Sequence, residues 1–106
     1  MFDAIRDFTL ALPDTEEGFP FGDDVLVFKV RGKMFLLVRL TEHPNPFSVK
    51  CVPERGEELR ATYPCIVLGW HLNKKHWVTV TNPEIITAEL LWELIRTSYE
   101  LVQKRH

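Results

Sequence analysis

Basic, aromatic and imidazole side chains come together in one stretch of the chain, residues 71–80, which reads His-Leu-Asn-Lys-Lys-His-Trp-Val-Thr-Val. A polar, cationic turn at its start leads directly into the alternation of apolar residues that is typical of a strand. Lysine can neutralise a phosphate, and an exposed tryptophan can stack on a base. The chemistry that these residue types could perform is therefore nucleic-acid binding.

The candidate nucleic-acid-binding residues lie mainly in a basic hairpin and in this turn. They are Lys29, Arg31, Lys33, Lys50, Asn73, Lys74, Lys75, His76 and Trp77. Phosphate contacts of this kind give affinity that tolerates many sequences. Packing is the competing interpretation at the aromatic positions, and we expect it for Trp77 and Phe35, while Trp70 is a further residue that could stack. Asn73 is expected to form the turn.

Metal and catalytic sites find little support in the sequence. His71 and His76 would point to opposite faces of an extended strand, because their separation is odd. The chain has no Cys-x-x-Cys or His-Glu-x-x-His pattern, and the glycine patterns of phosphate loops and nucleophile elbows are absent. Cys65 near these histidines could form a thiolate pair, but a cysteine in an apolar run is usually inert. We expect no catalytic residue, no metal, no cofactor and no enzymatic activity.

The composition indicates one domain over residues 1–106, with 45% hydrophobic residues, enough for a single core. No apolar run approaches the ~18 residues of a membrane span, and the first residues carry acids where a signal peptide would be basic. We therefore expect a cytoplasmic protein without a membrane partner. Cys51 and Cys65 are expected to be free, buried thiols.

The net charge of −2 conceals an uneven distribution along the chain. Residues 1–24 hold seven acids and one base, whereas residues 25–76 hold nine bases and four acids. The separation could place an anion-binding face beside an acidic one. It could equally be two lobes of opposite charge that attract each other.

The N-terminal half of the sequence predicts one helix and three strands. Apolar residues from Phe2 to Leu12 recur at helical spacing, and Pro13 ends the pattern. Residues 15–22 are expected to form a loop with a short extended piece at 19–21. Alternation then predicts strands near 25–31 and 34–40, joined at Gly32, and another over 47–52.

The hairpin at residues 25–40 has a predicted register and a predicted division of faces. With the loop Arg31-Gly32-Lys33, Val30 would oppose Met34 and Phe28 would oppose Leu36, which puts large apolar side chains on one face. The opposite face would carry Val27, Lys29, Phe35, Leu37 and Arg39.

The C-terminal half predicts a helix, one or two strands and a longer helix. Pro53 is suited to begin a helix that ends before Pro64. A short apolar run over 65–70, a turn over 73–75 and a strand over 77–81 follow. The last helix, from about Thr87 to Lys104, is expected to bury four residues, Leu91, Leu94, Ile95 and Val102.

These elements predict an α+β fold with two layers, an antiparallel sheet and helices on one face. Four stretches in the same order resemble the successive motifs of the MmcQ/YjbR family. They are Phe21–Phe35 (FGDDVLVFKVRGKMF), Val49–Glu54 (VKCVPE), His71–Trp77 (HLNKKHW) and Ser98–Val102 (SYELV). The chain departs at Leu68-Gly69-Trp70, where the family more often has Pro-Gly-Tyr, so this strand entry is expected to pack differently.

The resemblance implies the order α-β(3)-α-β(2)-α, similar to type III secretion chaperones, and no enzymatic activity. The family is usually labelled DNA-binding by analogy with a "double wing" arrangement. Two hypotheses follow. The first is a DNA-binding module that uses the basic hairpin and the His71–His76 turn. The second is an adaptor that binds another protein or forms a homodimer. A pI near 6.1 favours the second, because dedicated nucleic-acid binders tend to be basic.

Overall fold

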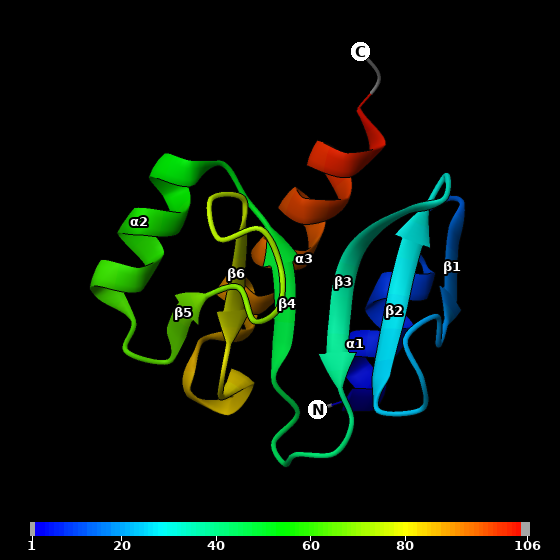
Figure 1. The fold of residues 1–106 in the computed structure, drawn as a ribbon, viewed down its shortest axis with the longest axis horizontal. Helices are drawn as coiled ribbons and strands as arrows, with labels where there is room; N and C mark the ends of the chain where they lie inside the picture. Colours follow the sequence, from blue (N-terminus) through cyan, green and yellow to red (C-terminus); the bar gives the residue numbers. More distant parts are fainter. Residues whose placement is uncertain (1, 105–106) are drawn as a thin grey trace.

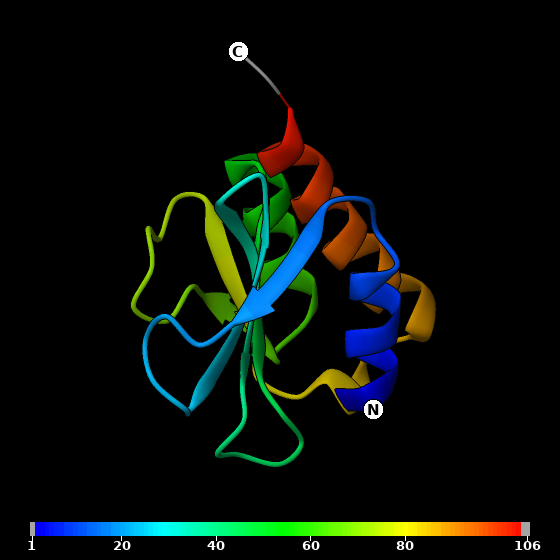
Figure 2. The same cartoon turned by 90° about the vertical axis from the view of Figure 1, so that its right-hand side faces the viewer.

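Six strands form one antiparallel sheet in the computed structural model, which describes residues 2–104. The elements are α1 (Phe2–Leu10), β1 (Thr15–Gly18), β2 (Val25–Val30), β3 (Lys33–Arg39), β4 (Phe47–Lys50), α2 (Pro53–Thr62), β5 (Ile66–Leu68), β6 (Trp77–Val80), η1 (Pro83–Ile85) and α3 (Ala88–Gln103). The strands lie side by side in the order β1-β2-β3-β4-β6-β5 (Figure 1). Helices α1 and α3 cover one face of the sheet, and loops project from the other (Figure 2). The predicted α+β class is confirmed.

Strand β1 is an element that the sequence does not predict. The expected loop over 15–22 is wrong for its first four residues, which pair with β2 from Thr15 opposite Val30 to Gly18 opposite Val27. An edge strand can be held by backbone pairing alone, so the Thr-Glu-Glu-Gly sequence of β1 needs no apolar alternation. The extended piece expected at 19–21 is instead a turn, in which the Gly22 N–H donates to the carbonyl of Phe19 (3.3 Å).

The β2–β3 hairpin turns through two residues, Arg31 and Gly32, which both have positive φ angles (54° and 79°). Phe28 opposes Leu36 as predicted, but the predicted pairing of Val30 with Met34 is wrong, because Val30 opposes Lys33. A bulge between these pairs leaves Phe35 without a partner in β2.

This bulge brings the Phe35 side chain to the helix side of the sheet. Its ring is fully buried and meets the ring of Tyr99 edge-on, with 5.3 Å between the centroids. The packed role predicted for Phe35 is confirmed. Its predicted place on the outer face is wrong, because the bulge shifts the alternation by one residue.

Helix α3 packs its apolar face on the sheet. The Thr87 hydroxyl caps its first turn by accepting from the Leu90 N–H (3.1 Å). The four residues that the sequence predicts as buried are at most 7% exposed, with Ile95 at 0%. Ile5 of α1 is equally buried and joins the same core. None of the helices within residues 2–104 is long and apolar enough to cross a membrane.

Strands β3 and β4 meet along a short seam in the middle of the sheet. Their register pairs run only from Leu36 opposite Val49 to Val38 opposite Phe47. Beyond this, the Ser98 hydroxyl of α3 donates to the Phe35 carbonyl (2.5 Å) and accepts from the Lys50 N–H (2.8 Å). A side chain of α3 therefore bridges the two strands where their backbone ladder ends.

Candidate ligand-binding groove

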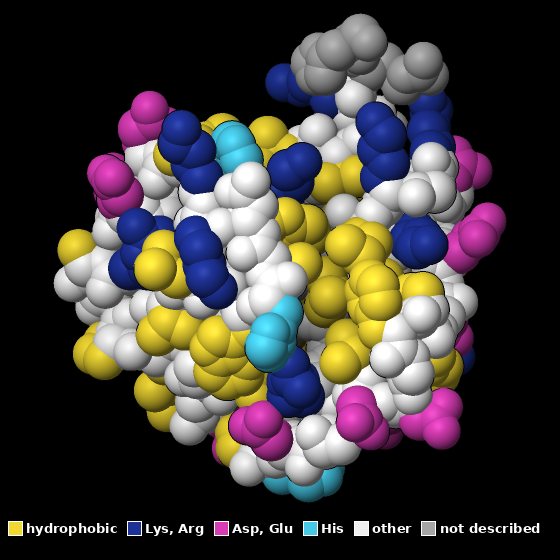
Figure 3. Space-filling model, in the orientation of Figure 1, with side chains coloured by type: hydrophobic (Ala, Val, Ile, Leu, Met, Phe, Trp, Pro, Cys, Tyr) yellow, Lys and Arg dark blue, Asp and Glu magenta, His cyan; other side chains and the backbone are white. Residues whose placement is uncertain are grey.

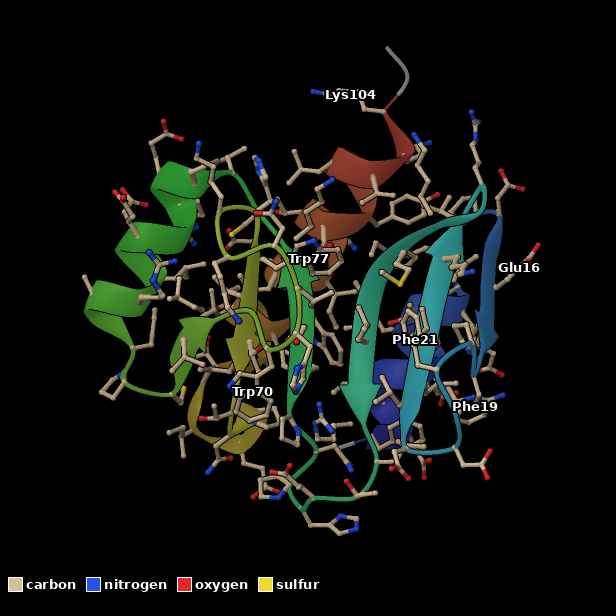
Figure 4. The ribbon with its side chains drawn as sticks, in the orientation of Figure 1. Glu16, Phe19, Phe21, Trp70, Trp77 and Lys104 are labelled. Carbon is tan, nitrogen blue, oxygen red and sulfur yellow. The ribbon has the colours of Figure 1, made fainter. Side chains whose placement is uncertain are left out.

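A groove of about 300 Å³ lies on the outer face of the sheet, opposite α1 and α3. Its floor comes from the central strands, and its walls come from two loops, residues 19–24 and 69–76, which we call the 19–24 loop and the 69–76 loop. It is lined by Phe21, Val25, Leu37, Arg39, Pro46, Ser48, Trp70, His71, Leu72 and Thr79. Figure 3 shows apolar side chains gathered on both sides of this hollow. Figure 4 shows Phe21 and Trp70 over opposite halves of the sheet.

The 69–76 loop is held closely against β6. A Cβ at Gly69 would lie 2.6 Å from the Cβ of Trp77, so only glycine fits there. The Gly69 N–H donates to the Trp77 carbonyl (3.0 Å), and the Trp70 N–H donates to Oγ1 of Thr79 (3.0 Å). His71 then has a φ of +59°, in the left-handed region that few residues with side chains adopt. The close approach fixes Trp70 and His71 at one wall of the groove.

The floor of the groove has a polar centre in an apolar surround. Leu37 of β3, Ser48 of β4 and Thr79 of β6 are register neighbours across three strands. Oγ of Ser48 and Oγ1 of Thr79 lie 2.7 Å apart and share a hydrogen bond. The two hydroxyls therefore satisfy part of each other's hydrogen-bonding capacity in a place that water reaches poorly, with Ser48 7% and Thr79 1% exposed.

Arg39 supplies the positive charge of the groove. Its guanidinium carbon lies 5.7 Å from the centroid of the Trp70 ring, a cation–π arrangement. Its Nε is 3.9 Å from the nearest carboxylate oxygen, that of Glu42, which is too long for a hydrogen bond. Arg39 crosses from β3 toward the opposite wall, and its donors remain available to a ligand.

The 19–24 loop places two large apolar side chains in solvent. Phe19 is 48% exposed and Phe21 is 63% exposed. Gly22, with a φ of 107°, allows the chain to turn back into β2 after them. Exposed aromatic side chains beside an apolar hollow are typical of a surface that meets a partner.

The predicted basic hairpin does not line this groove. Lys29 is half-buried on β2 and is the register partner of Glu16 on β1, which places a carboxylate beside it. Arg31 and Lys33 are exposed at the hairpin turn. Lys50 is the last residue of β4 and is half-buried.

The predicted turn residues have mainly structural contacts. Oδ1 of Asn73 accepts from the Lys75 N–H (2.8 Å), which confirms the turn-forming role. The Lys74 ammonium donates to the Gly69 carbonyl (2.5 Å) and so closes the 69–76 loop. The His76 carbonyl accepts from the Cys51 N–H (2.9 Å). Trp77 is 8% exposed, so its predicted packing is confirmed.

None of the nine predicted nucleic-acid-binding residues lines the groove. Lys29 and the loop of Lys74 lie on the same side of the sheet, but strands β3 and β4 separate β2 from β6. In Figure 3 the lysine and arginine side chains are scattered around the apolar surface, and one lies between its two parts. Most groove residues belong to none of the four sequence motifs. The features of the sequence that could have indicated the groove are the apolar outer face of β2 and β3 and the aromatic residue Trp70.

The two cysteines are unpaired and buried, as predicted. Burial raises the pKa of the Cys51 thiol, against the opposing effect of Arg60 and Arg55. Burial also raises the pKa of the Cys65 thiol. Both groups are therefore poor nucleophiles near neutral pH. Within residues 2–104, no three His, Cys, Asp or Glu side chains gather closely enough to hold a metal ion.

Known proteins are similar to this chain in sequence and in fold. The uncharacterized protein YbdF of Escherichia coli O157:H7 is 35% identical over 102 residues, which cover 96% of this chain and 84% of that protein. The crystal structure of Deinococcus radiodurans protein DR2400, described as a DUF419 domain, is 49% identical with a TM-score of 0.94. The match covers 99% of this chain and 80% of that one.

A Pseudomonas syringae protein solved by the Northeast Structural Genomics Consortium is more distant. It is 25% identical with a TM-score of 0.77, over 94% of this chain and 97% of that one. The model of the YjbR family matches residues 10–101, from the end of α1 to the last turns of α3. The motifs, the fold and these matches agree, and the chain belongs to the YjbR family.

Proposed function

We propose that this protein is a non-enzymatic binding module that holds a segment of another polypeptide in its outer-face groove. The observation that carries the proposal is the groove itself, a mainly apolar hollow of about 300 Å³ between two loops. Phe21 at its rim is 63% exposed, and its side chain extends the apolar surface beyond the hollow. A polypeptide segment can cover both the hollow and this rim.

Three further observations support this proposal. The raised pKa values of both thiols leave the chain's cysteines poorly suited to nucleophilic catalysis. Unpaired cysteines are typical of a reducing compartment, and a cytoplasmic location is part of the proposal. The net charge of −2 favours a protein partner over nucleic acid.

Selection of peptides from a random library displayed on phage tests this proposal. We expect enrichment on the native protein and loss of affinity by more than about tenfold on the Leu37→Glu variant, because a negative charge at the groove floor disfavours apolar and acidic ligands. Leu37 is half-buried on the outer face, so the longer side chain can extend into the groove.

Val67→Glu is the matched control. Val67 is also half-buried and is the register partner of Thr79, but it does not line the groove. Its variant should bind the selected peptides like the native protein. Absence of any enrichment, or equal loss in both variants, would refute the proposed function.

Nucleic-acid binding is the second candidate function. It is favoured by the lysine and arginine side chains scattered around the apolar surface in Figure 3. About three to five phosphate contacts would give a slope of log affinity against log salt of roughly −3 to −4.5 for duplex DNA. The double substitution of Lys74 and Lys75 by glutamate should then weaken binding more than tenfold, because it removes phosphate contacts and adds negative charge.

Lys104→Glu is the control for this second candidate, since Lys104 follows the last turn of α3, away from the groove. Arg105, its neighbour, lies outside the described residues. No binding to DNA or RNA at ~50 mM salt with tens of micromolar protein would eliminate nucleic acid as the ligand.

A further inference from the structure

One hydroxyl hydrogen at the floor of the groove has no acceptor in the described part of the protein. Oγ of Ser48 and Oγ1 of Thr79 share a single hydrogen bond, and Thr79 also accepts from the Trp70 N–H. Two hydroxyls carry two hydrogens, and the bond between them uses one. Both side chains are more than nine-tenths buried, so the remaining donor faces a site with little water.

The guanidinium of Arg39 is a second donor in the same groove. In residues 2–104 it makes no hydrogen bond, and its only ion pair is the 3.9 Å contact with Glu42. The Trp70 ring holds it in place from one side. An arginine in this position can direct two parallel N–H groups at one carboxylate.

We infer that the groove receives a carboxylate, carried by an aspartate or glutamate side chain within an apolar segment of the partner polypeptide. This inference rests on the proposed function of the groove. A carboxylate accepts hydrogen bonds only, so it matches a floor whose free groups, the hydroxyl of the Ser48–Thr79 pair and the guanidinium of Arg39, are donors.

The position of the donors argues for a side chain in the interior of the segment. The Ser48–Thr79 pair lies on β4 and β6, with apolar surface from Phe21 and Val25 on one side and from Leu72 on the other. A segment that covers both sides must pass over the pair in its middle. The surplus of bases in residues 25–76 adds a favourable field for an acidic segment.

A pair of labelled peptides tests the inference by fluorescence anisotropy. The first is acetyl-Gly-Leu-Phe-Glu-Phe-Leu-Gly-amide, and the second has glutamine in place of glutamate. We expect the glutamate peptide to bind the native protein about tenfold to a hundredfold more tightly than the glutamine peptide. The reason is that hydrogen bonds to a charged group are stronger than neutral ones in a site with little water. Random-library selection should likewise enrich one acidic residue between apolar ones.

Two variants connect this preference to the floor of the groove. Arg39→Gln should bring the affinity of the glutamate peptide down to that of the glutamine peptide. The double variant Ser48→Ala with Thr79→Val should reduce the preference by about tenfold, because it removes both hydroxyls. Arg31→Gln, at the exposed hairpin turn, should leave the preference unchanged. Thermal melting confirms that each variant is folded.

The possible outcomes separate this inference from the proposed function. Equal affinity for both peptides, or library selection without an acidic residue, overturns the inferred preference for a carboxylate. The proposed binding of a polypeptide segment is then retained. If free phenylacetate binds more tightly than the peptide, the carboxylate belongs to a small molecule, and a polypeptide is not the ligand. A homodimer in light scattering that excludes the glutamate peptide also overturns the inference, because a second copy then fills the groove through other contacts.

Discussion

The two faces of the sheet are built from alternate residues of the same strands, yet their surroundings differ. On β3, Leu36 and Val38 face the helices and are fully buried, whereas Leu37 and Arg39 face outward and are half-buried. Helix α3 fills the space on the first side with fitted apolar side chains. On the second side two loops stand apart and leave a groove between them.

Because of this difference, the helix side of the sheet mainly supports stability, and the groove side is suited to binding. A side chain on the helix side is surrounded by other side chains, so its removal leaves a cavity. A half-buried side chain in the groove, such as Leu37, is open on the side that faces the hollow, and a ligand can supply the missing contacts there. Substitutions on the two faces should therefore change different properties.

The largest loss of stability is expected on the helix side. Leu94 of α3 is 3% exposed, and Leu94→Ala should lower the free energy of unfolding by about 2 to 5 kcal/mol, the usual range for buried leucines. Denaturant titration measures this change. A loss below about 1 kcal/mol would mean that the face is not tightly packed.

A smaller loss is expected where the 69–76 loop meets β6. A Cβ at Gly69 lies 2.6 Å from that of Trp77, so Gly69→Ala must move the loop, at a cost of about 1 to 3 kcal/mol. Because the loop carries Trp70, peptide affinity should fall as well. Gly18→Ala is the matched control, since nothing lies within 4 Å of a Cβ there. Equal effects of the two substitutions would contradict the close approach.

In the groove, stability and affinity should separate. Leu37→Ala removes a half-buried side chain and should cost about 1 kcal/mol of folding free energy, as is common for partly exposed sites. The affinity for selected peptides should nevertheless fall severalfold. Calorimetric melting and anisotropy measure the two quantities on the same sample. A change of stability as large as that for Leu94→Ala would remove the distinction between the faces.

The thiols should show the smallest change under native conditions. Burial raises the pKa of Cys51 and Cys65, so the thiolate fraction at pH 7 lies below that of a free cysteine and grows only as the pH rises. Iodoacetamide should modify neither residue within minutes in the folded protein and both after denaturation. Rapid native modification seen by mass spectrometry would show that these thiols are accessible.

The sequence predicts the parts of this fold that have a clear period. Helical spacing identifies α3 and its buried residues, and alternation identifies β2 and β3. Strand β1 was missed because Thr-Glu-Glu-Gly carries no apolar pattern, and the place of Phe35 was missed because a single bulged residue reverses the face of its neighbours.

The groove was less predictable than the fold. Its walls come from loops far apart in the sequence, and the partnership of Ser48 with Thr79 depends on β4 lying beside β6. The basic residues singled out from the sequence are distinguished by charge, whereas the groove is distinguished by shape. Only Trp70 among the aromatic candidates considered from the sequence lines the groove.

The seam between β3 and β4 divides the sheet into two three-stranded halves, β1-β2-β3 and β4-β6-β5. The groove lies over this seam, with Leu37 on one side of it and Ser48 on the other. A segment bound there touches both halves at once, so it adds links at a place where the two halves share only three register pairs. Hydrogen exchange of amides at the ends of the seam, that of Lys50 among them, should therefore slow when a peptide binds.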